Sequence, residues 1–221
     1  MRFGEARWRV GLAYWHPDYL RRLGFQPRTL IDVGVATGTP PLYAAWPEAF
    51  LALVEPLDDF SRAIESILAK RPGRWFQAAA GSAEGELGIR VEPLWKERSS
   101  FFTRHEREHT GDEAMLRRVR VATLDQIVEE GALKPPFGLK IDAEGAELDV
   151  IRGASATLRD TQFVIAEVSV APRFEGGYRF AEFIAAMDEA GFSVCDILDL
   201  GRAGPVVTFF DLVFRRKDSA N

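Results

Sequence analysis

The chain has 221 residues, of which 47% are hydrophobic and 28% charged, a composition typical of a soluble globular protein with one large domain. Its net charge of −5 provides no general attraction to nucleic acid or to an anionic membrane, so neither is an expected partner. The single cysteine excludes an intrachain disulfide, and no apolar run approaches the roughly 20 residues of a membrane span, so we expect a cytoplasmic protein.

The first 28 residues mix aromatic side chains with arginines, and a helix is predicted from Pro17 to Leu23, with Gly24 as its end. We interpret residues 1–28 as a helical flap packed on the main domain. A lid over an acceptor site and a dimer contact are the alternatives, which leaves a homodimer open. Residues 29–221 are predicted to form one domain, with an excursion at 82–122.

A glycine turn follows the first predicted strand, which covers residues 29–33. Gly34 to Gly38 form this turn, and Pro40 and Pro41 suit the first turn of a helix. Strand, glycine turn and helix together hold nucleotide-like ligands at the carboxyl end of a central parallel strand. A second apolar strand, 50–54, leads to Glu55, about 20 residues further on, where such folds place the acid that binds a ribose.

Strands and helices alternate along the rest of the chain. A helix with one apolar stripe (60–68) precedes a strand at 75–79, and half-exposed strands are expected near 87–91 and 119–121. Further elements are expected at 126–130 (a helix capped by Asp125), 137–141, 146–152, 162–168, 180–190, 192–198 and 206–214. This order predicts a three-layer α/β sandwich on a mostly parallel sheet that ends in an antiparallel hairpin.

The glycine turn favours one class of cofactor. The dinucleotide fingerprint G-x-G-x-x-G fails, because Ala36 and Thr39 occupy its second and third glycine positions, and the phosphate-binding G-x-x-x-x-G-K-S/T is absent. An acid followed by small residues, Asp32-x-Gly34-x-Ala36-x-Gly38, resembles the first motif of S-adenosylmethionine-dependent methyltransferases instead. Small residues let the backbone approach the methionine part of that ligand, and the acid can meet its ammonium group. An NAD-dependent oxidoreductase is a weaker alternative.

A longer string narrows the resemblance. Leu139 to Glu147 (LKIDAEGAE), followed by Val150 to Ala154 (VIRGA), is similar to a signature of the FkbM family of methyltransferases. The segments 32–34, 121–125 and 211–214 also resemble that family, and the similarity covers about residues 29–215. The resemblance implies a seven-stranded Rossmann-like methyltransferase sheet and O-methylation, often of sugar hydroxyls or natural-product scaffolds.

The resemblance also implies an S-adenosyl-L-methionine site. Glu55 would accept hydrogen bonds from both ribose hydroxyls, and the alanines after the third strand would contact adenine through the main chain and apolar packing. The expected cofactor-binding residues are Asp32, Gly34, Val35, Ala36, Thr37, Gly38, Glu55, Pro56, Leu57, Ala79, Ala80 and Asp142.

Carboxylates near the end of the fourth strand are the expected catalytic groups. Asp142 is the first choice for a general base or an acceptor-orienting group, with helix capping as the alternative. Glu144 and Glu167 could join it in a cluster. Such oxygen ligands would suit Mg²⁺, but we favour loop hydrogen bonds without a metal. Lys140, inside an apolar strand, needs a buried carboxylate as its partner.

The acceptor itself is not specified by these residues. A small molecule with a hydroxyl group, such as a sugar, is expected; N-methylation, carboxyl methylation and a non-catalytic ligand-binding domain of the same fold are the alternatives. His105, His109, Ser99 and Ser100 lie in a highly charged segment, where solvated loop positions are the default and contacts to substrate or cofactor the alternative. Cys195 is expected in the core.

Overall fold

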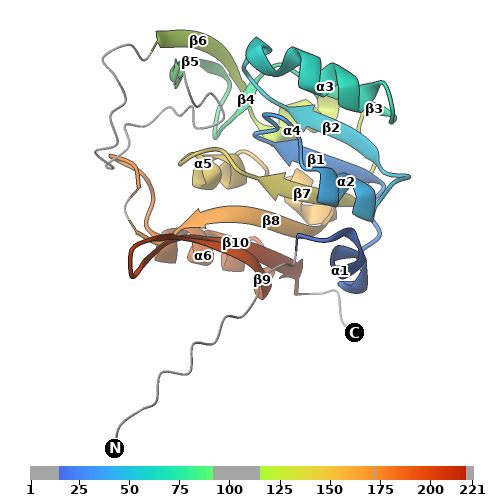
Figure 1. The fold of residues 1–221 in the computed structure, drawn as a ribbon. Coiled ribbons are helices and arrows are strands. Elements are labelled where there is room, and N and C mark those ends of the chain that lie inside the picture. The colour runs from blue at the N-terminus through green and yellow to red at the C-terminus, as the bar shows by residue number, and fades with distance from the viewer. Residues whose placement is uncertain (1–14, 92–114, 172, 218–221) are drawn as a thin grey trace, which may run out of the picture.

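A seven-stranded sheet forms the centre of the computed structural model, which describes residues 15–91, 115–171 and 173–217. In spatial order its strands are β3 (Gly73–Phe76), β2 (Phe50–Val54), β1 (Thr29–Val33), β7 (Phe137–Ile141), β8 (Thr161–Ser169), β10 (Val206–Arg216) and β9 (Phe192–Ala203). β10 runs antiparallel to both of its neighbours, whereas β3, β2, β1, β7 and β8 are parallel to one another (Figure 1). The predicted mostly parallel sheet with a C-terminal hairpin is therefore confirmed.

Helices cover both faces of this sheet (Figure 1). One core contains residues of α1 (Pro17–Arg22), α2 (Pro40–Ala45) and α3 (Ser61–Leu68), the last preceded by the 3₁₀ turn η1 (Asp58–Phe60). The other core contains residues of α4 (Leu124–Glu130), α5 (Glu147–Arg152) and α6 (Phe180–Glu189), and the 3₁₀ turn η3 (Thr157–Asp160) leads into β8. The three-layer sandwich follows, because each helix buries one apolar face against the sheet.

A smaller sheet accounts for the described part of the excursion at 82–122. Its strands are β4 (Ala79–Ala80), β6 (Met115–Ala122) and β5 (Gly85–Val91), in that spatial order. Inward-facing side chains such as Ile89 and Val121 join the core on the α1–α3 side. His105, His109, Ser99 and Ser100 lie outside the described residues, so their expected roles stay predictions.

Local sequence signals set several boundaries, but the expectations for Asp125 and Cys195 were wrong. Thr123, rather than Asp125, caps α4, because Thr123 and Gln126 satisfy each other's backbone amides in a capping box. Asp125 instead accepts hydrogen bonds from the amides of residues 156 and 157. Cys195 is exposed and not in the core, because β9 is the outermost strand of the sheet.

The N-terminal part of the described chain packs against the C-terminal hairpin. Trp15 donates a hydrogen bond to Asp211 of β10, and Leu20 of α1 is fully buried. The flap function assigned to residues 1–28 stays a prediction. None of the helices found in residues 15–91, 115–171 and 173–217 is long and apolar enough to cross a membrane.

Three acidic residues of the sheet point toward the same face. Successive side chains of a strand point to opposite faces, so residues two apart share a face. Leu30, Ile165 and Val213 all belong to the core on the α1–α3 side. Asp32, Glu167 and Asp211, each two positions from one of these, therefore point toward the same side. The candidate functional site lies on this face.

Candidate functional site

A cavity of about 360 Å³ opens at the carboxyl ends of the central strands. This position, outside the ends of parallel strands where the chain order reverses, is the usual ligand site of doubly wound sheets. The sequence-predicted residues that line the cavity are Gly34, Val35, Ala36, Thr37, Gly38, Glu55, Pro56, Leu57, Ala79, Ala80, Asp142 and Glu144. Asp32 does not border it.

The glycine turn brings the end of β1 directly against the end of β7. Gly34 has φ +74°, and a Cβ atom there would lie 1.8 Å from the carbonyl oxygen of Asp142, so no other residue fits without moving a strand. The amides of Val35 and Thr37 donate to no acceptor within the part of the chain that the structure describes, whereas that of Gly38 bonds the carbonyl of Val35. Two backbone donors at the cavity wall are thus available to a ligand.

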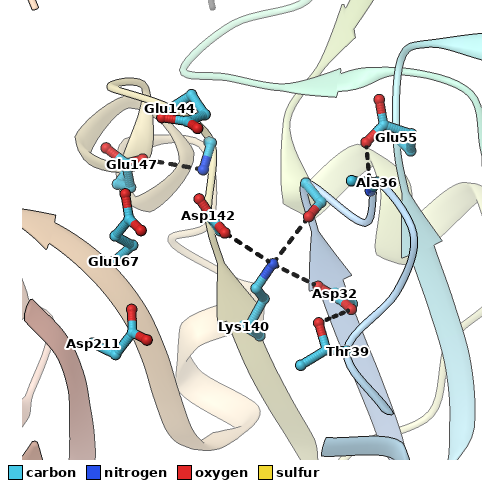
Figure 2. A network of polar contacts seen from close by, with 12 residues as sticks. Asp32, Ala36, Thr39, Glu55, Lys140, Asp142, Glu144, Glu147, Glu167 and Asp211 are labelled. Carbon is cyan, nitrogen blue, oxygen red and sulfur yellow. Dashed lines mark hydrogen bonds and ion pairs between the residues drawn. The ribbon is translucent and has the colours of Figure 1, made fainter. Parts of the chain in front are cut away.

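Glu55 is a fixed acceptor at the end of β2, with 5% of its surface exposed. Its Oε2 accepts a hydrogen bond from the amide of Ala36 at 3.0 Å (Figure 2). Its Oε1 accepts one from the amide of Leu57 at 3.0 Å. Burial raises the pKa of the Glu55 carboxyl, and these two hydrogen bonds partly oppose that rise. Because each oxygen keeps a lone pair, the carboxylate can also accept from two hydroxyl groups of a ligand.

Asp32 is completely buried beneath the turn instead of facing the cavity. Its Oδ2 accepts hydrogen bonds from the hydroxyls of Thr39 (2.9 Å) and Tyr43 (2.5 Å). Burial and the neighbouring Asp32 raise the pKa of the Tyr43 hydroxyl, which keeps it a donor. The physical reason for this placement is strand alternation, which points Asp32 toward α2.

Lys140 has the carboxylate partner that its sequence context required. Its Nζ lies 3.3 Å from Oδ1 of Asp32, 3.6 Å from Oδ2 of Asp142 and 3.0 Å from the carbonyl oxygen of Gly34 (Figure 2). Burial lowers the pKa of Lys140, but the charges of Asp32 and Asp142 together raise it by more than burial lowers it. The net shift is upward, so the side chain stays a charged ammonium. This ammonium joins β1, its turn and the end of β7.

Beyond the strand ends, one row of residues crosses the sheet. The last residues of β2, β1 and β7 are partners in the ladder, so Glu55, Gly34 and Asp142, which directly follow them, lie side by side. Glu167 continues the row on β8, and Asp211 on β10 is its direct partner. The row therefore places four carboxylates along one cavity, with the glycine turn between the first and the second.

Arg173 neutralises part of this row. Its guanidinium bonds Glu167 and lies 3.3 Å from Oε2 of Glu144, while the rings of Phe174 and Phe209 pack within 5.3 Å and 4.9 Å of it. Burial and the charge of Asp142 raise the pKa of Glu167, and Arg173 opposes them. Among the described residues no group of three or more His, Cys, Asp or Glu is placed to hold a metal ion.

The cavity residues absent from the sequence-predicted site include Trp15, Lys140, Glu167 and Asp211. Glu167 had been considered as a member of a carboxylate cluster, and Asp211 belongs to a segment that resembles the FkbM family. Lys140, Glu167 and Asp211 share one signal, their alternate positions along a strand, which becomes informative once the strand order is known, whereas Trp15 precedes α1 and has no such signal.

Comparison with known proteins places the chain in a family. The model of the methyltransferase FkbM domain matches residues 32–194. The hexuronic acid methyltransferase AglP of Haloferax volcanii is 26% identical over 167 residues, which are 74% of this chain and 66% of AglP. The chain thus spans slightly less than two thirds of that relative.

Two solved structures share the fold. The FkbM methyltransferase of Methylobacillus flagellatus superposes with a TM-score of 0.51 at 14% identity, covering 85% of this chain and 43% of that one. The magnesium protoporphyrin IX methyltransferase ChlM of Synechocystis PCC 6803, solved with bound S-adenosylmethionine, gives 0.50 at 9% identity, covering 90% and 76%. The family match over residues 32–194 confirms the resemblance of the lysine-to-glycine string, and the chain belongs to the FkbM methyltransferase family.

Proposed function

We propose that this protein is an S-adenosylmethionine-dependent methyltransferase that methylates a hydroxyl group of a small molecule. The observation that carries the proposal is the row of cavity residues, in which Glu55 and the glycine turn form one end and carboxylates form the other. S-adenosyl-L-methionine is a cation at sulfur, and a cavity bordered by more carboxylates than ammonium groups is complementary to it.

The residues present fit this cofactor. The carboxylate of Glu55 suits the two ribose hydroxyls, and the backbone amides of Val35 and Thr37 suit the methionine carboxylate. Leu57 and Ala79 provide apolar wall for the adenine. The cofactor supplies a methyl group that is already activated by its bond to a positively charged sulfur, so the protein's main task is alignment of the acceptor.

Asp142 lies where the cofactor and acceptor ends of the cavity meet. Because Lys140 pairs with one of its oxygens, we assign Asp142 a role in orienting the acceptor hydroxyl rather than in removing its proton. Glu144 lies two residues after Asp142 and forms an ion pair with Arg173, and it would contact the same substrate. The role assigned to Asp142 predicts lost turnover with retained cofactor affinity in Asp142→Asn.

The curated relative supports a sugar as the acceptor, and the proposal of a hydroxyl group as the methylated position is our own. AglP is named a hexuronic acid methyltransferase, and carboxylates are suitable acceptors for the hydrogen bonds of a polyol. N-methylation, carboxyl methylation and ligand binding without catalysis are distinct outcomes of the tests below.

Titration calorimetry with S-adenosylmethionine, S-adenosylhomocysteine and NAD tests the cofactor. Glu55→Gln keeps the shape of the side chain but removes hydrogen bonds to a charged group, which contribute about 1.5–3 kcal/mol, so we expect affinity to fall roughly 10- to 100-fold. Glu48→Gln, at an exposed position of the same chain, is the matched control. Binding of NAD in place of the methyl donor would contradict the proposal.

Labelled methyl donor tests the transfer. The protein is incubated with isotopically labelled S-adenosylmethionine and fractionated cell extract, and products are identified by mass shift. We expect the label on an oxygen of a carbohydrate-like compound. Label on nitrogen or as a methyl ester would correct the acceptor class, and cofactor binding without any transfer would support the non-catalytic alternative.

A further inference from the structure

We propose that Asp211 is the base that takes the proton from the acceptor hydroxyl. The inference rests on the proposed function and adds a residue and an atom to it. Asp211 lies on β10, the antiparallel strand of the sheet, and borders the same cavity as the glycine turn.

The geometry of Asp211 leaves one oxygen for a substrate. Oδ2 accepts a hydrogen bond from the indole Nε1 of Trp15 at 2.8 Å, which fixes the orientation of the carboxylate. Oδ1 accepts no hydrogen bond from any residue that the structure describes. In Figure 2, Asp211 stands with Glu167 on the far side of Asp142 from Asp32, at the end of the row away from the cofactor residues.

The other carboxylates at the acceptor end of the cavity lie beside cations. Asp142 lies 3.6 Å from the ammonium of Lys140, and Arg173 pairs with both Glu144 and Glu167. A cation beside a carboxylate lowers its affinity for a proton and so weakens it as a base. Within the described chain Asp211 has no ion pair, which singles it out among the acids that face the acceptor end.

The surroundings of Asp211 also suit proton transfer. Burial raises its pKa to about 6; the charges of Asp142 and Asp199 raise it as well, while the indole of Trp15 and the charge of Lys140 lower it. Glu167 also faces it from β8. A general base works best when its pKa lies near the working pH, and such bases accelerate reactions about 10²- to 10⁴-fold.

The step balances without a further reactant. The acceptor oxygen forms a bond to the methyl carbon, and the carbon–sulfur bond breaks with its electron pair left on sulfur. The hydroxyl proton passes to Oδ1 of Asp211, which becomes a neutral carboxylic acid and later releases the proton to water.

Nuclear magnetic resonance of the Trp15 indole tests the environment of Asp211 without any turnover. We expect the ¹H–¹⁵N signal of Trp15, assigned by its loss in Trp15→Phe, to shift with a midpoint near pH 6, and this transition to be absent in Asp211→Asn. A midpoint below about pH 4.5, close to the ordinary value for an aspartate, would overturn the proposal.

Transfer of labelled methyl to the acceptor fraction tests the chemistry. Asp211→Asn keeps an oxygen that can accept the hydrogen bond from Trp15, so we expect cofactor affinity to be unchanged. We expect kcat to fall roughly 100-fold or more. In the wild type the plot of kcat against pH should fall below about pH 6, the acidic limb of the profile, and this limb should be lost in the variant. Asp199→Asn, the exposed partner of Asp211 on β9, is the control and should retain kcat at pH 8. Asp142→Asn removes a charge that raises the pKa of Asp211, so the acidic limb of its residual activity should move to lower pH.

The outcomes separate the two proposals. If the wild type transfers methyl groups and Asp211→Asn retains both kcat and the acidic limb, the assignment of the base is overturned. The methyltransferase proposal would still stand. Absence of transfer by the wild-type protein would contradict the function, and the base would be rejected with it.

Discussion

Asp32 and Asp211 are two carboxylates on the same face of one sheet, and they differ in their partners. Asp32 is completely buried and bonded by Thr39, Tyr43 and Lys140. Asp211 borders the cavity, has one hydrogen bond from Trp15, and has a pKa raised to about 6 by burial in the first place. A buried carboxylate paired with a cation and with hydroxyl donors holds the fold together, whereas one without a cation is poised to accept a proton.

The largest effect is expected from removing the cation of Asp32. Lys140→Met leaves the Asp32 carboxylate buried without its ion pair, which costs about 3–5 kcal/mol of unfolding free energy. Urea unfolding followed by circular dichroism measures the loss. Lys70→Met, at an exposed position after α3, should change little. If the Asp32→Asn/Lys140→Met double variant does not recover part of the stability, charge burial is not the cause.

Removal of the charge of Asp211 is expected to act in the opposite direction. A folded-state pKa raised from 3.8 to about 6 means that the carboxyl contributes stability below pH 4 that is lost as the pH rises through 6. Asp211→Asn escapes this loss. Relative to wild type, it should gain about 1–3 kcal/mol between pH 4 and pH 8, since one pKa unit corresponds to 1.36 kcal/mol. Equal pH dependence of urea unfolding in both proteins would contradict the comparison.

The hydroxyl donors of Asp32 can be removed one at a time. Tyr43→Phe deletes a hydrogen bond to a buried charged group and should lower the unfolding free energy by about 1.5–3 kcal/mol. Thr39→Val deletes the longer bond to the same oxygen, at a less buried position, and should cost less. Thermal and urea unfolding of both variants at pH 7 provide the test, and a reversed order would show that the two bonds are not ranked by burial.

The smallest effect is expected from the donor of Asp211. The indole of Trp15 lowers the pKa of Asp211, so Trp15→Phe should raise that pKa by up to about one unit, the equivalent of one hydrogen bond. Carbon-13 resonance of the Asp211 carboxyl across pH 4–8 measures the midpoint directly. A fall of the midpoint would mean that burial by Trp15 outweighs its hydrogen bond.

Local signals explain which parts of the fold could be predicted. β1, β2 and β7 are unbroken apolar runs bounded by turn residues, and their predicted limits agree with the structure. The third strand begins at Gly73 rather than at the predicted Trp75, because glycine disfavours a strand locally and only pairing with β2 extends the strand to it. The cap of α4 was predictable in retrospect, since Thr123 followed by Gln126 is a capping box.

The sequence by itself determined the family and most of the cavity wall. A glycine at a crowded turn and an acid at the end of the next strand are local requirements of the cavity. The sequence shows them directly as Gly34 and Glu55. The tertiary structure decided which acids border the cavity, because the side of the sheet that a side chain faces depends on the register between distant strands. It placed Asp32 beneath the turn, against Lys140, and brought Asp211 from the end of the chain to the cavity. Side-chain direction alternates at every residue of a strand, whereas strand order and register are set by the packing of the whole sheet.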